Sequence, residues 1–333
     1  MNRMDGFQDR PEGKFAARFG RKKKILGLPL QVTDGVILGG LLFLTALAAV
    51  FNKRVERPLT VIAGNLLLIL LYLGAVLWLE KISSRLGRFL LRTASVQCLF
   101  LQIFQTGCDV QRIFFGWQDE TILRLEKSVF GVQPVVWIQQ FARPWLTEWM
   151  MFVYVVYVVI YPALGAYIFF KRGERANEDY LFHLGLANLV CALGFIVFPV
   201  AAPMNWPDIR ALLDVPLRGG VFTSVAELIR TRVHDPGGSI PSPHCAVATV
   251  MWIMAWRYGK RWFYILAPVI LSLYVSTVYG RFHYVTDAVV GIAAAVLVIV
   301  IGPAIVTGWN RRVSSGPSLP DQGPVRGSRL FRA

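Results

Sequence analysis

Long runs of apolar residues constrain this chain more than any other feature of its sequence. The clearest lie at 59–79, 149–170, 262–279 and 288–307, and each approaches the roughly 20 residues that a helix needs to cross a bilayer. Runs at 35–51, 180–200 and 245–258 are shorter or less pure, and 88–109 is partly polar. With 55% hydrophobic and 17% charged residues, the composition excludes an ordinary soluble domain. We therefore expect an all-α polytopic membrane protein with eight spans, the third and sixth being the weakest.

The net charge of +15 indicates membrane topology rather than a nucleic-acid partner. Lys and Arg residues gather at the ends of the apolar runs and in both tails, and no basic patch alternates with aromatic residues. With both termini on one side of the membrane, 23 of the 35 Lys and Arg residues fall on that side and 12 on the other. Because positive loops favour the cytoplasm, both termini are expected there. The loops 110–147 and 201–243 and the turn 280–284 then face outward, to a periplasm or a lumen.

Composition divides the chain into four segments. Residues 1–30 read as a basic cytoplasmic tail without a cleavable signal sequence, and 31–87 hold two N-terminal transmembrane helices. Residues 88–307 hold the other six spans, and 308–333, rich in Pro, Gly, Ser and Arg, are expected to be a disordered cytoplasmic tail. In the first outer loop, 121–130 has helical apolar spacing, which predicts either an interfacial helix or a loop helix packed on the span ends.

The turn after the seventh span, "YGRFHYVTD", holds His283 and Asp287, four residues apart. On a helix this spacing places the two side chains on one face. A carboxylate beside an imidazole fixes its tautomer and aims its other nitrogen, as a nucleophile or a base requires. A polar cap at a span end is the alternative, but ionisable residues at membrane depth are costly and usually functional.

A second histidine, His244, ends the loop "GGSIPSPH" and begins the sixth span. The 38 residues between His244 and His283 fit two short membrane passes joined by a basic turn at 258–261. A hairpin of this length returns the chain to the face that it left. We therefore expect the two histidines to meet at the outer ends of adjacent helices.

The loop before His244 has the composition of an anion site. Gly238 and its neighbouring glycine allow close backbone approach, and backbone amides at a helix start attract phosphate. Ser242 would add a hydroxyl donor. An ordinary turn that caps a span is the alternative for this loop.

Two histidines, an aspartate and an anion-binding loop on one face together predict phosphoryl transfer. One histidine attacks phosphorus, the other protonates the leaving oxygen, and loop donors stabilise the equatorial oxygens, so neither a metal nor a cofactor is required. The four cysteines lack metal-ligand spacing. His183 falls on the opposite face and is expected to be structural, whereas His234 in the outer loop could line the pocket.

The motifs "SIPSPH" and "HYVTD" resemble the second and third signature motifs of the phosphatidic acid phosphatase type 2/haloperoxidase superfamily. The resemblance covers about residues 88–306 and implies a six-helix catalytic membrane domain, here 88–307, with the motifs on the outer or lumenal side. It implies that His283 is the nucleophile that becomes phosphorylated and Asp287 its partner. It also implies that His244 is the general acid and Ser242 the phosphate-binding serine.

The sequence departs from that pattern in its cations. The first motif, a lysine followed by an Arg-Pro pair, is not visible in 201–243, and Thr277 stands where the third motif has an arginine. The stretch "FPVAAPMNWP" and Tyr279 are instead similar to the inositol phosphorylceramide synthase branch. A site with fewer cations suits a phosphodiester, which carries one charge where a monoester carries almost two. Candidate replacements are Arg281, Arg210 and Arg218, and a solvated interfacial charge is the alternative for each.

The sequence thus predicts a metal-independent membrane enzyme that moves a phosphoryl or phospho-headgroup from a lipid through a phosphohistidine. A lipid alcohol as acceptor, as in inositol phosphorylceramide synthase, is slightly favoured. The alternative is a lipid phosphate phosphatase that hydrolyses phosphatidate or a prenyl diphosphate. A non-catalytic scaffold or a transporter is more distant, because transporters place their polar groups near the membrane midplane. The expected partners are a lipid substrate and the membrane, and nothing indicates an oligomeric state.

Overall fold

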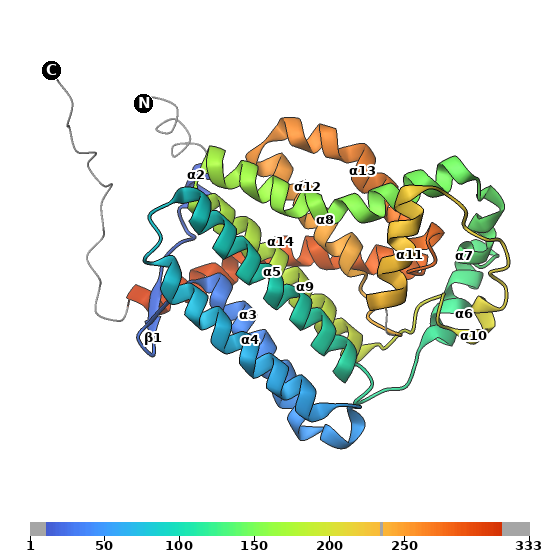
Figure 1. Cartoon of the computed structure of the whole chain (residues 1–333), viewed down its shortest axis with the longest axis horizontal. Coiled ribbons are helices and arrows are strands. Elements are labelled where there is room, and N and C mark those ends of the chain that lie inside the picture. Colours follow the sequence, from blue (N-terminus) through green and yellow to red (C-terminus); the bar gives the residue numbers. More distant parts are fainter. Residues whose placement is uncertain (1–10, 234–235, 315–333) are drawn as a thin grey trace.

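Eight long helices, one for each predicted span, form the body of the protein (Figure 1). They belong to residues 11–233 and 236–314, the part of the chain that the computed structural model describes. Their bounds are α3 (Val32–Val50), α4 (Pro58–Leu79), α5 (Arg85–Val110), α8 (Pro144–Arg172), α9 (Glu174–Val197), α12 (Pro243–Tyr258), α13 (Lys260–Tyr279) and α14 (Val285–Ser314). The predicted all-α membrane architecture is confirmed.

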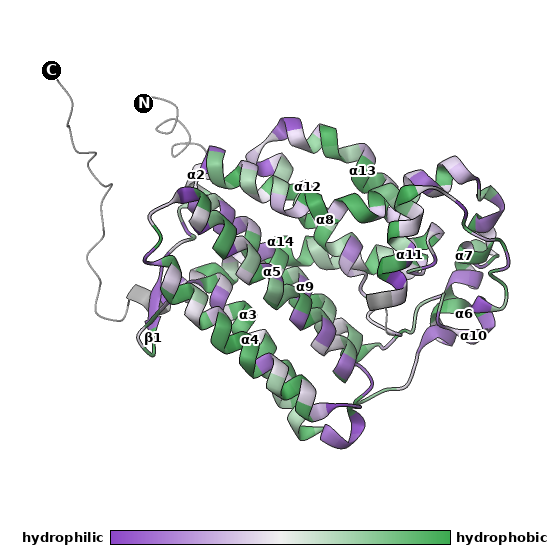
Figure 2. Cartoon of the chain, viewed as in Figure 1, coloured by the Kyte–Doolittle hydropathy of each residue, from purple (hydrophilic) through white to green (hydrophobic). Residues whose placement is uncertain are grey.

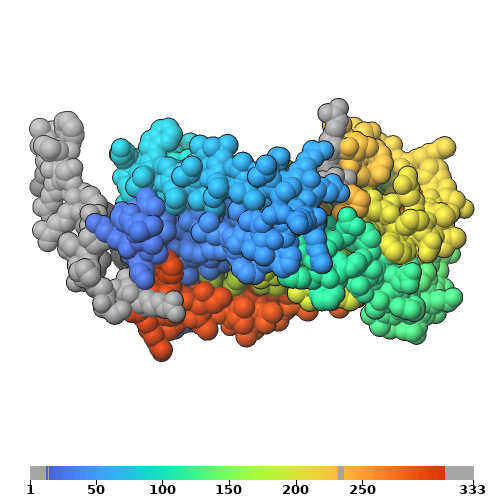
Figure 3. Space-filling view, turned by 90° about the horizontal axis from the view of Figure 1, so that it is seen from below, coloured from blue at the N-terminus to red at the C-terminus, as the bar shows by residue number. Residues whose placement is uncertain are grey.

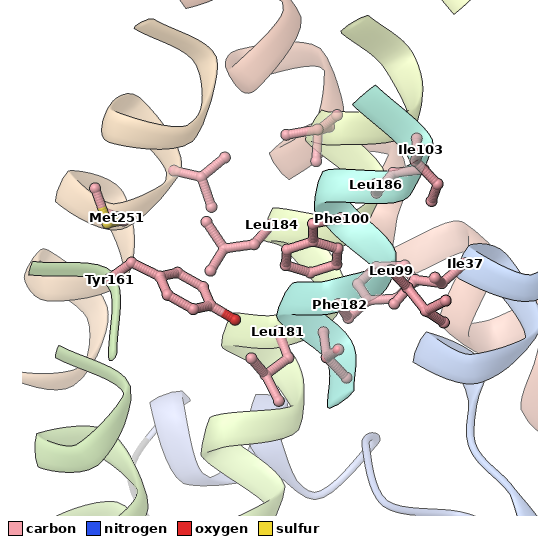
Figure 4. Close-up of a cluster of buried hydrophobic side chains, with 14 of the residues drawn as sticks. Ile37, Leu99, Phe100, Ile103, Tyr161, Leu181, Phe182, Leu184, Leu186 and Met251 are labelled. Atoms are coloured by element: carbon pink, nitrogen blue, oxygen red, sulfur yellow. The ribbon is translucent and has the colours of Figure 1, made fainter. Parts of the chain in front are cut away.

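Six of these helices are long and apolar enough to cross a membrane, and α5 and α12 are the two that are not. They are the third and sixth spans, which the sequence marks as weakest. Both pack against several neighbours: α12 against α8, α9, α13 and α14, and α5 against α3, α4 and α9, with one face of α5 exposed. Buried core side chains shown in Figure 4 come from α3, α5, α8, α9 and α12, and include Ile37, Leu99, Phe100, Ile103, Tyr161, Leu181, Phe182, Leu184, Leu186 and Met251.

Apolar side chains also cover much of the outside of the bundle (Figure 2). Helix α4 exposes Leu66, Leu67, Leu70 and Leu71, each between 46% and 66% accessible. Exposing such an apolar face to water costs free energy, whereas contact with lipid tails does not. The six apolar spans and this lipid-facing surface identify an integral membrane protein.

Polar side chains join the two N-terminal spans to the rest of the bundle. Asn65 of α4 donates to the Thr45 hydroxyl of α3 at 2.9 Å, and Gln102 of α5 donates to Asn65 Oδ1 at 2.6 Å. Near the first residues of α3 and α5, Arg92 of α5 forms a salt bridge with Asp34 of α3. Hydrogen bonds between helices add to association where apolar burial contributes little.

The described part of the N-terminal segment is folded onto the end of the bundle. It contains α2 (Pro11–Ala16) and a hairpin of β1 (Lys23–Ile25) and β2 (Leu28–Leu30), and Phe19 packs on Phe182 at 5.6 Å between ring centroids. At the other terminus α14 continues through 308–314, inside the segment expected to be disordered, where Asn310 donates to the Arg18 carbonyl at 2.9 Å. Residues 1–10 and 315–333 lie outside the described residues.

Shorter helices from the outer loops gather at the opposite end of the molecule (Figure 1), where Figure 3 shows the green and yellow loop segments together. One of these shorter helices, α11, is capped by a side chain of α8. Glu148 accepts hydrogen bonds from the backbone amides of Gly220, Phe222 and Thr223 at the start of α11. The sequence predicts α6 but not α11. The bounds are η1 (Asn52–Arg54), α6 (Asp119–Phe130), α7 (Pro134–Trp137), η2 (Ile138–Phe141), α10 (Pro207–Arg210) and α11 (Val221–Val233).

The short length of α12 shapes the site. Its 16 residues span about 24 Å, less than a bilayer core of roughly 30 Å, whereas α8 has 29 residues. The loop that leads into α12 is therefore buried among longer helices such as α8 and α14. Ser239 and Ser242 in this loop are at most 1% exposed.

Candidate active site

The side-chain amide of Gln111, the residue after α5, holds the loop that leads into α12. Its Oε1 accepts from the backbone N–H of Gly238 at 3.0 Å, and its Nε2 donates to the Pro236 carbonyl at 3.1 Å. Gly237 and Gly238 have φ angles of +113° and +66°, which residues with a Cβ rarely adopt. A Cβ on Gly237 would lie 2.1 to 2.4 Å from the Gln111 amide. The glycine pair is therefore what allows Gln111 to grip this loop.

His283 lies in the turn between α13 and α14, two residues before α14 begins at Val285. The backbone amides of Phe282 and His283 both donate to the Thr277 carbonyl at 3.0 Å and close the turn. Asp287 is in the first turn of α14, where its Oδ2 accepts from the Tyr284 amide at 3.0 Å, a reach-back typical of helix starts. His283 Nδ1 and Asp287 Oδ2 are 3.5 Å apart, and the residues are 4% and 0% exposed. The structure thus brings this pair together.

Ser239 lies between His283 and Asp287. Its hydroxyl donates to Asp287 Oδ2 at 2.5 Å, and its Oγ lies 3.2 Å from His283 Nδ1. The sequence analysis missed this residue. "SIPSPH" contains two serines, and the pattern alone does not show which of them faces the imidazole.

His244, the second residue of α12, approaches His283 from the other side. His244 Nδ1 is 3.2 Å from His283 Nε2, so the α12–α13 hairpin brings the two rings together. His244 stacks on Tyr154 of α8 at 4.8 Å between ring centroids, and Tyr154 stacks in turn on Phe282 at 4.2 Å. The His244 imidazole is thus held against an aromatic wall formed by Tyr154 of α8 and Phe282 of the turn before α14.

Two carboxylates of α6 support the start of α14. Glu126 Oε1 accepts from the amide and the hydroxyl of Thr286 at 2.7 and 3.0 Å, and Asp119 Oδ1 accepts from the Tyr284 hydroxyl at 3.0 Å. Burial raises the pKa of Asp119 to about 6 and also raises the pKa of Glu126, with the Asp287 charge as a lesser cause in each. Sequence analysis proposed an interfacial or a packed helix here, and these contacts show that α6 packs on the bundle.

An apolar cavity of about 240 Å³ begins at His244 and extends between α5, α8, α9 and α12. Exposed side chains such as Leu101 and Val158 stand on its α5 and α8 walls, so it borders the lipid-facing surface. Its lining includes Phe100, Leu101, Phe104, Tyr157, Val158, Leu184 and Val247, together with the amides of Gln97, Gln105 and Asn188.

The predicted phosphate ligands occupy different positions. Ser242 is the N-cap of α12, accepts from the Cys245 amide at 3.4 Å and is fully buried. The Gly238 amide donates to Gln111. Arg281, with φ +67°, donates to the carbonyls of Leu213 and Val215.

Arginine side chains line a second cavity, of about 320 Å³, on the Phe282 side of the aromatic wall. Arg281 and Arg210 share this cavity with Arg230, which the sequence analysis did not select. The Tyr154 and Phe282 rings stand between this cavity and the His244 ring. Arg218 lies on the exposed surface of the same outer loop.

Of the two remaining histidines, His183 and His234, the structure describes only His183. His183 is buried at the other end of the bundle, where its Nδ1 pairs with Asp179 Oδ1 at 2.8 Å. His234 lies outside the described residues. Within residues 11–233 and 236–314, no three His, Cys, Asp or Glu side chains are placed to hold a metal ion.

Comparison with known proteins agrees with this geometry. A family model of the PAP2 superfamily matches residues 120–301, more than half of the chain, including Ser239, His244, His283 and Asp287. No curated protein and no solved structure matches the chain. The protein therefore belongs to the PAP2 superfamily, which makes it a membrane enzyme of the phosphatase or phosphotransferase type with a lipid as its general class of substrate.

Proposed function

We propose that this protein transfers a phosphoryl or phospho-headgroup from a lipid donor through a covalent intermediate on His283. The observation that carries the proposal is the contact of His283 Nε2 with His244 Nδ1 at 3.2 Å, with Ser239 and Asp287 behind the other nitrogen. A buried imidazole with one nitrogen held and the other facing a second proton carrier has the parts of an activated nucleophile.

The two histidines divide the chemistry. His283 Nε2 attacks phosphorus and forms the nitrogen–phosphorus bond, while the bond to the leaving oxygen breaks and His244 gives that oxygen its proton. The acceptor hydroxyl then returns a proton to His244 as its oxygen attacks the phosphohistidine. Ser242 would donate its hydroxyl hydrogen to a phosphoryl oxygen. No step requires a metal.

Substrate binding has to separate the histidines. A reacting phosphorus lies about 3 to 3.5 Å from its nucleophile, and His244 Nδ1 occupies that distance from His283 Nε2, at 3.2 Å. The His244 ring also lines the apolar cavity, so a small rotation into that space makes room for phosphorus. The structure is thus a closed resting state of the proposed site.

The cavity beside His244 supports a lipid substrate. Aliphatic and aromatic side chains line most of it, and it borders the lipid-facing surface between α5 and α8. A hydrocarbon chain that enters from the bilayer would keep its apolar surroundings and place its phosphate at the histidines.

The arrangement of cations supports the transferase preference. Arg281 and Arg210 line a cavity that the Tyr154 and Phe282 rings separate from His244. We propose that these two arginines bind the headgroup and leave few cations at phosphorus, and that Arg218, exposed on the same outer loop, adds positive charge from the surface. This arrangement suits a phosphodiester donor and a lipid alcohol acceptor, as in inositol phosphorylceramide synthase. Hydrolysis of a lipid phosphate is the second candidate, since water fits wherever an alcohol does.

Product analysis tests the proposal. The purified protein in detergent is given labelled phosphatidate, prenyl diphosphate or phosphatidylinositol, with and without a lipid alcohol. A labelled new lipid that requires the alcohol is the expected result, and free phosphate as the sole product would establish the phosphatase. Activity of H283A equal to that of an active wild type would contradict His283 as the nucleophile in both, and no conversion of any of these lipids by the wild type would favour a scaffold or a transporter.

A further inference from the structure

We propose that Ser239 is a positioning residue that transmits the charge of Asp287 to His283 and holds the imidazole with its proton on Nδ1. The consequence for turnover rests on the proposed function, whereas the position of the proton does not. Ser239 lies outside the residues that the sequence motifs select for catalysis.

Counting hydrogens in the contacts gives one arrangement. An ionised Asp287 can only accept, so the single hydroxyl hydrogen of Ser239 points to Asp287 Oδ2 at 2.5 Å. Ser239 Oγ then has lone pairs for His283, and His283 Nδ1 at 3.2 Å is the donor. In neutral His283, Nε2 is therefore bare, and His244 Nδ1 at 3.2 Å must be its donor.

The hydroxyl is better placed than the carboxylate to hold the ring. The direct separation between His283 Nδ1 and Asp287 Oδ2 is 3.5 Å, whereas both steps through Ser239 are shorter. Asp287 Oδ2 also accepts from the Tyr284 amide at 3.0 Å, which keeps it at the helix start. Since hydrogen bonds weaken beyond about 3.2 Å, the relay through Ser239 is the stronger connection.

The backbone fixes Ser239 in this position. Gln111 grips the preceding residue through the Gly238 amide at 3.0 Å, and the Ser242 amide donates to the Asp287 carbonyl at 3.0 Å. Ser239 itself is 1% exposed, so water does not compete for its hydroxyl.

The relay determines which nitrogen reacts. With Nδ1 protonated, the lone pair on Nε2 attacks phosphorus, and the leaving oxygen takes its proton from His244. The proton on Nδ1 stays in place, and Asp287 balances the positive charge of the phosphorylated ring through the Ser239 hydroxyl. No proton has to leave the relay during the step.

Nitrogen-15 NMR of the histidine-labelled protein in detergent tests the inference, because four histidines give few signals to assign. The wild type should show His283 protonated at Nδ1 and bare at Nε2. S239A should shift this population toward the other tautomer and lower kcat by about 10-fold to 100-fold, with KM nearly unchanged. S239T keeps the hydroxyl and should restore much of both.

A matched control is S276A, which removes another buried serine hydroxyl, one that donates to the Met150 carbonyl at 2.6 Å. It should leave the tautomer of His283 and kcat near wild type. Nε2 protonated in the wild type, or a tautomer that S239A leaves unchanged, would overturn the relay. The expected tautomer in a protein inactive on every lipid phosphate would support the relay and contradict the proposed function.

Discussion

Single residues of the site depend on one another because each makes hydrogen bonds to a buried neighbour. Ser239 bridges His283 and Asp287, and Gln111 holds the loop that carries Ser239. In a water-excluded region an unpaired polar group is costly, so the loss of one member affects the others. Two substitutions test this scale: G237A changes the geometry of the loop, and D119N removes the charge of a buried carboxylate.

G237A tests the role of the glycine pair. The new Cβ would overlap the Gln111 amide at 2.1 to 2.4 Å in a backbone with φ +113°, so the Gln111 amide or the loop must shift, and the hydrogen bonds between them are disturbed. We expect kcat to fall at least about 10-fold while the helical content stays the same. G74A is the control, since nothing lies within 4 Å of the Cβ that it adds to α4. Equal kcat in both variants would contradict the proposed grip of Gln111.

D119N tests the buried carboxylate that accepts a hydrogen bond from Tyr284, the residue after His283. Because its pKa is raised from 3.8 to about 6, folded Asp119 binds its proton more tightly than the unfolded chain does. Its contribution to stability is therefore present below pH 3.8 and lost as the pH rises through about 6. Asparagine can still accept from the Ala201 amide and donate to Tyr284.

The measurement for D119N is the thermal midpoint in detergent between pH 4 and 7. The midpoint of D119N minus that of the wild type should increase as the pH rises from 4 through about 6 and then level off. Glu126 titrates in both proteins and cancels in the difference. A difference that does not change with pH would contradict the raised pKa of Asp119.

The sequence identified those site residues that a local pattern reveals. His283 and Asp287 are four residues apart, and the length of the hairpin brings His244 to them, so one-dimensional spacing was enough to predict that they meet. Ser239 and Gln111 could not be found this way. Gln111 is more than 100 residues from the loop that it holds, and the choice between Ser239 and Ser242 depends on how that loop turns.

At the scale of elements, hydropathy located all eight long helices, six of them because a lipid-facing helix must be apolar over most of its length, and α5 and α12 through weaker apolar runs. Their ends moved by a few residues where polar side chains continue the helix, as in α8 and α14. The sequence did not predict α11 because this helix depends on contacts with α8. Its capping group, Glu148, belongs to α8, which is distant in the sequence.

The cavity between α5, α8, α9 and α12 can be tested through its wall. V247F adds volume inside the cavity of about 240 Å³, where the proposed lipid chain lies. KM for a long-chain donor should rise about 10-fold, while a short-chain donor is converted nearly as by the wild type. V300F on the exposed face of α14, where Val300 is 68% accessible, is the matched control. An unchanged KM for the long-chain donor in V247F would place the chain elsewhere.

At the scale of the whole molecule, the loop helices and the site lie at one end of the bundle, and α2 and the β1–β2 hairpin at the other (Figure 1). We propose that the end with the site faces the periplasm or lumen and the other end faces the cytoplasm. The excess of Lys and Arg at the terminal end, 23 against 12, supports this orientation.

Cysteine accessibility tests the orientation. K81C lies between α4 and α5, and G116C lies between α5 and α6 at the end with the site. A membrane-impermeant thiol reagent applied outside intact cells should label G116C and leave K81C unlabelled until the cells are opened. The wild-type protein, with its four native cysteines, gives the background. Labelling of K81C in intact cells would reverse the proposed orientation.

Capture of the covalent intermediate tests the central claim most directly. The protein is mixed with a lipid donor labelled at phosphorus, stopped with alkali within one turnover, and digested for mass spectrometry. The account predicts an acid-labile, alkali-stable label on Nε2 of His283, absent from H283A and formed far more slowly in D287N. Label on another residue, or turnover by H283A at the wild-type rate, would contradict it.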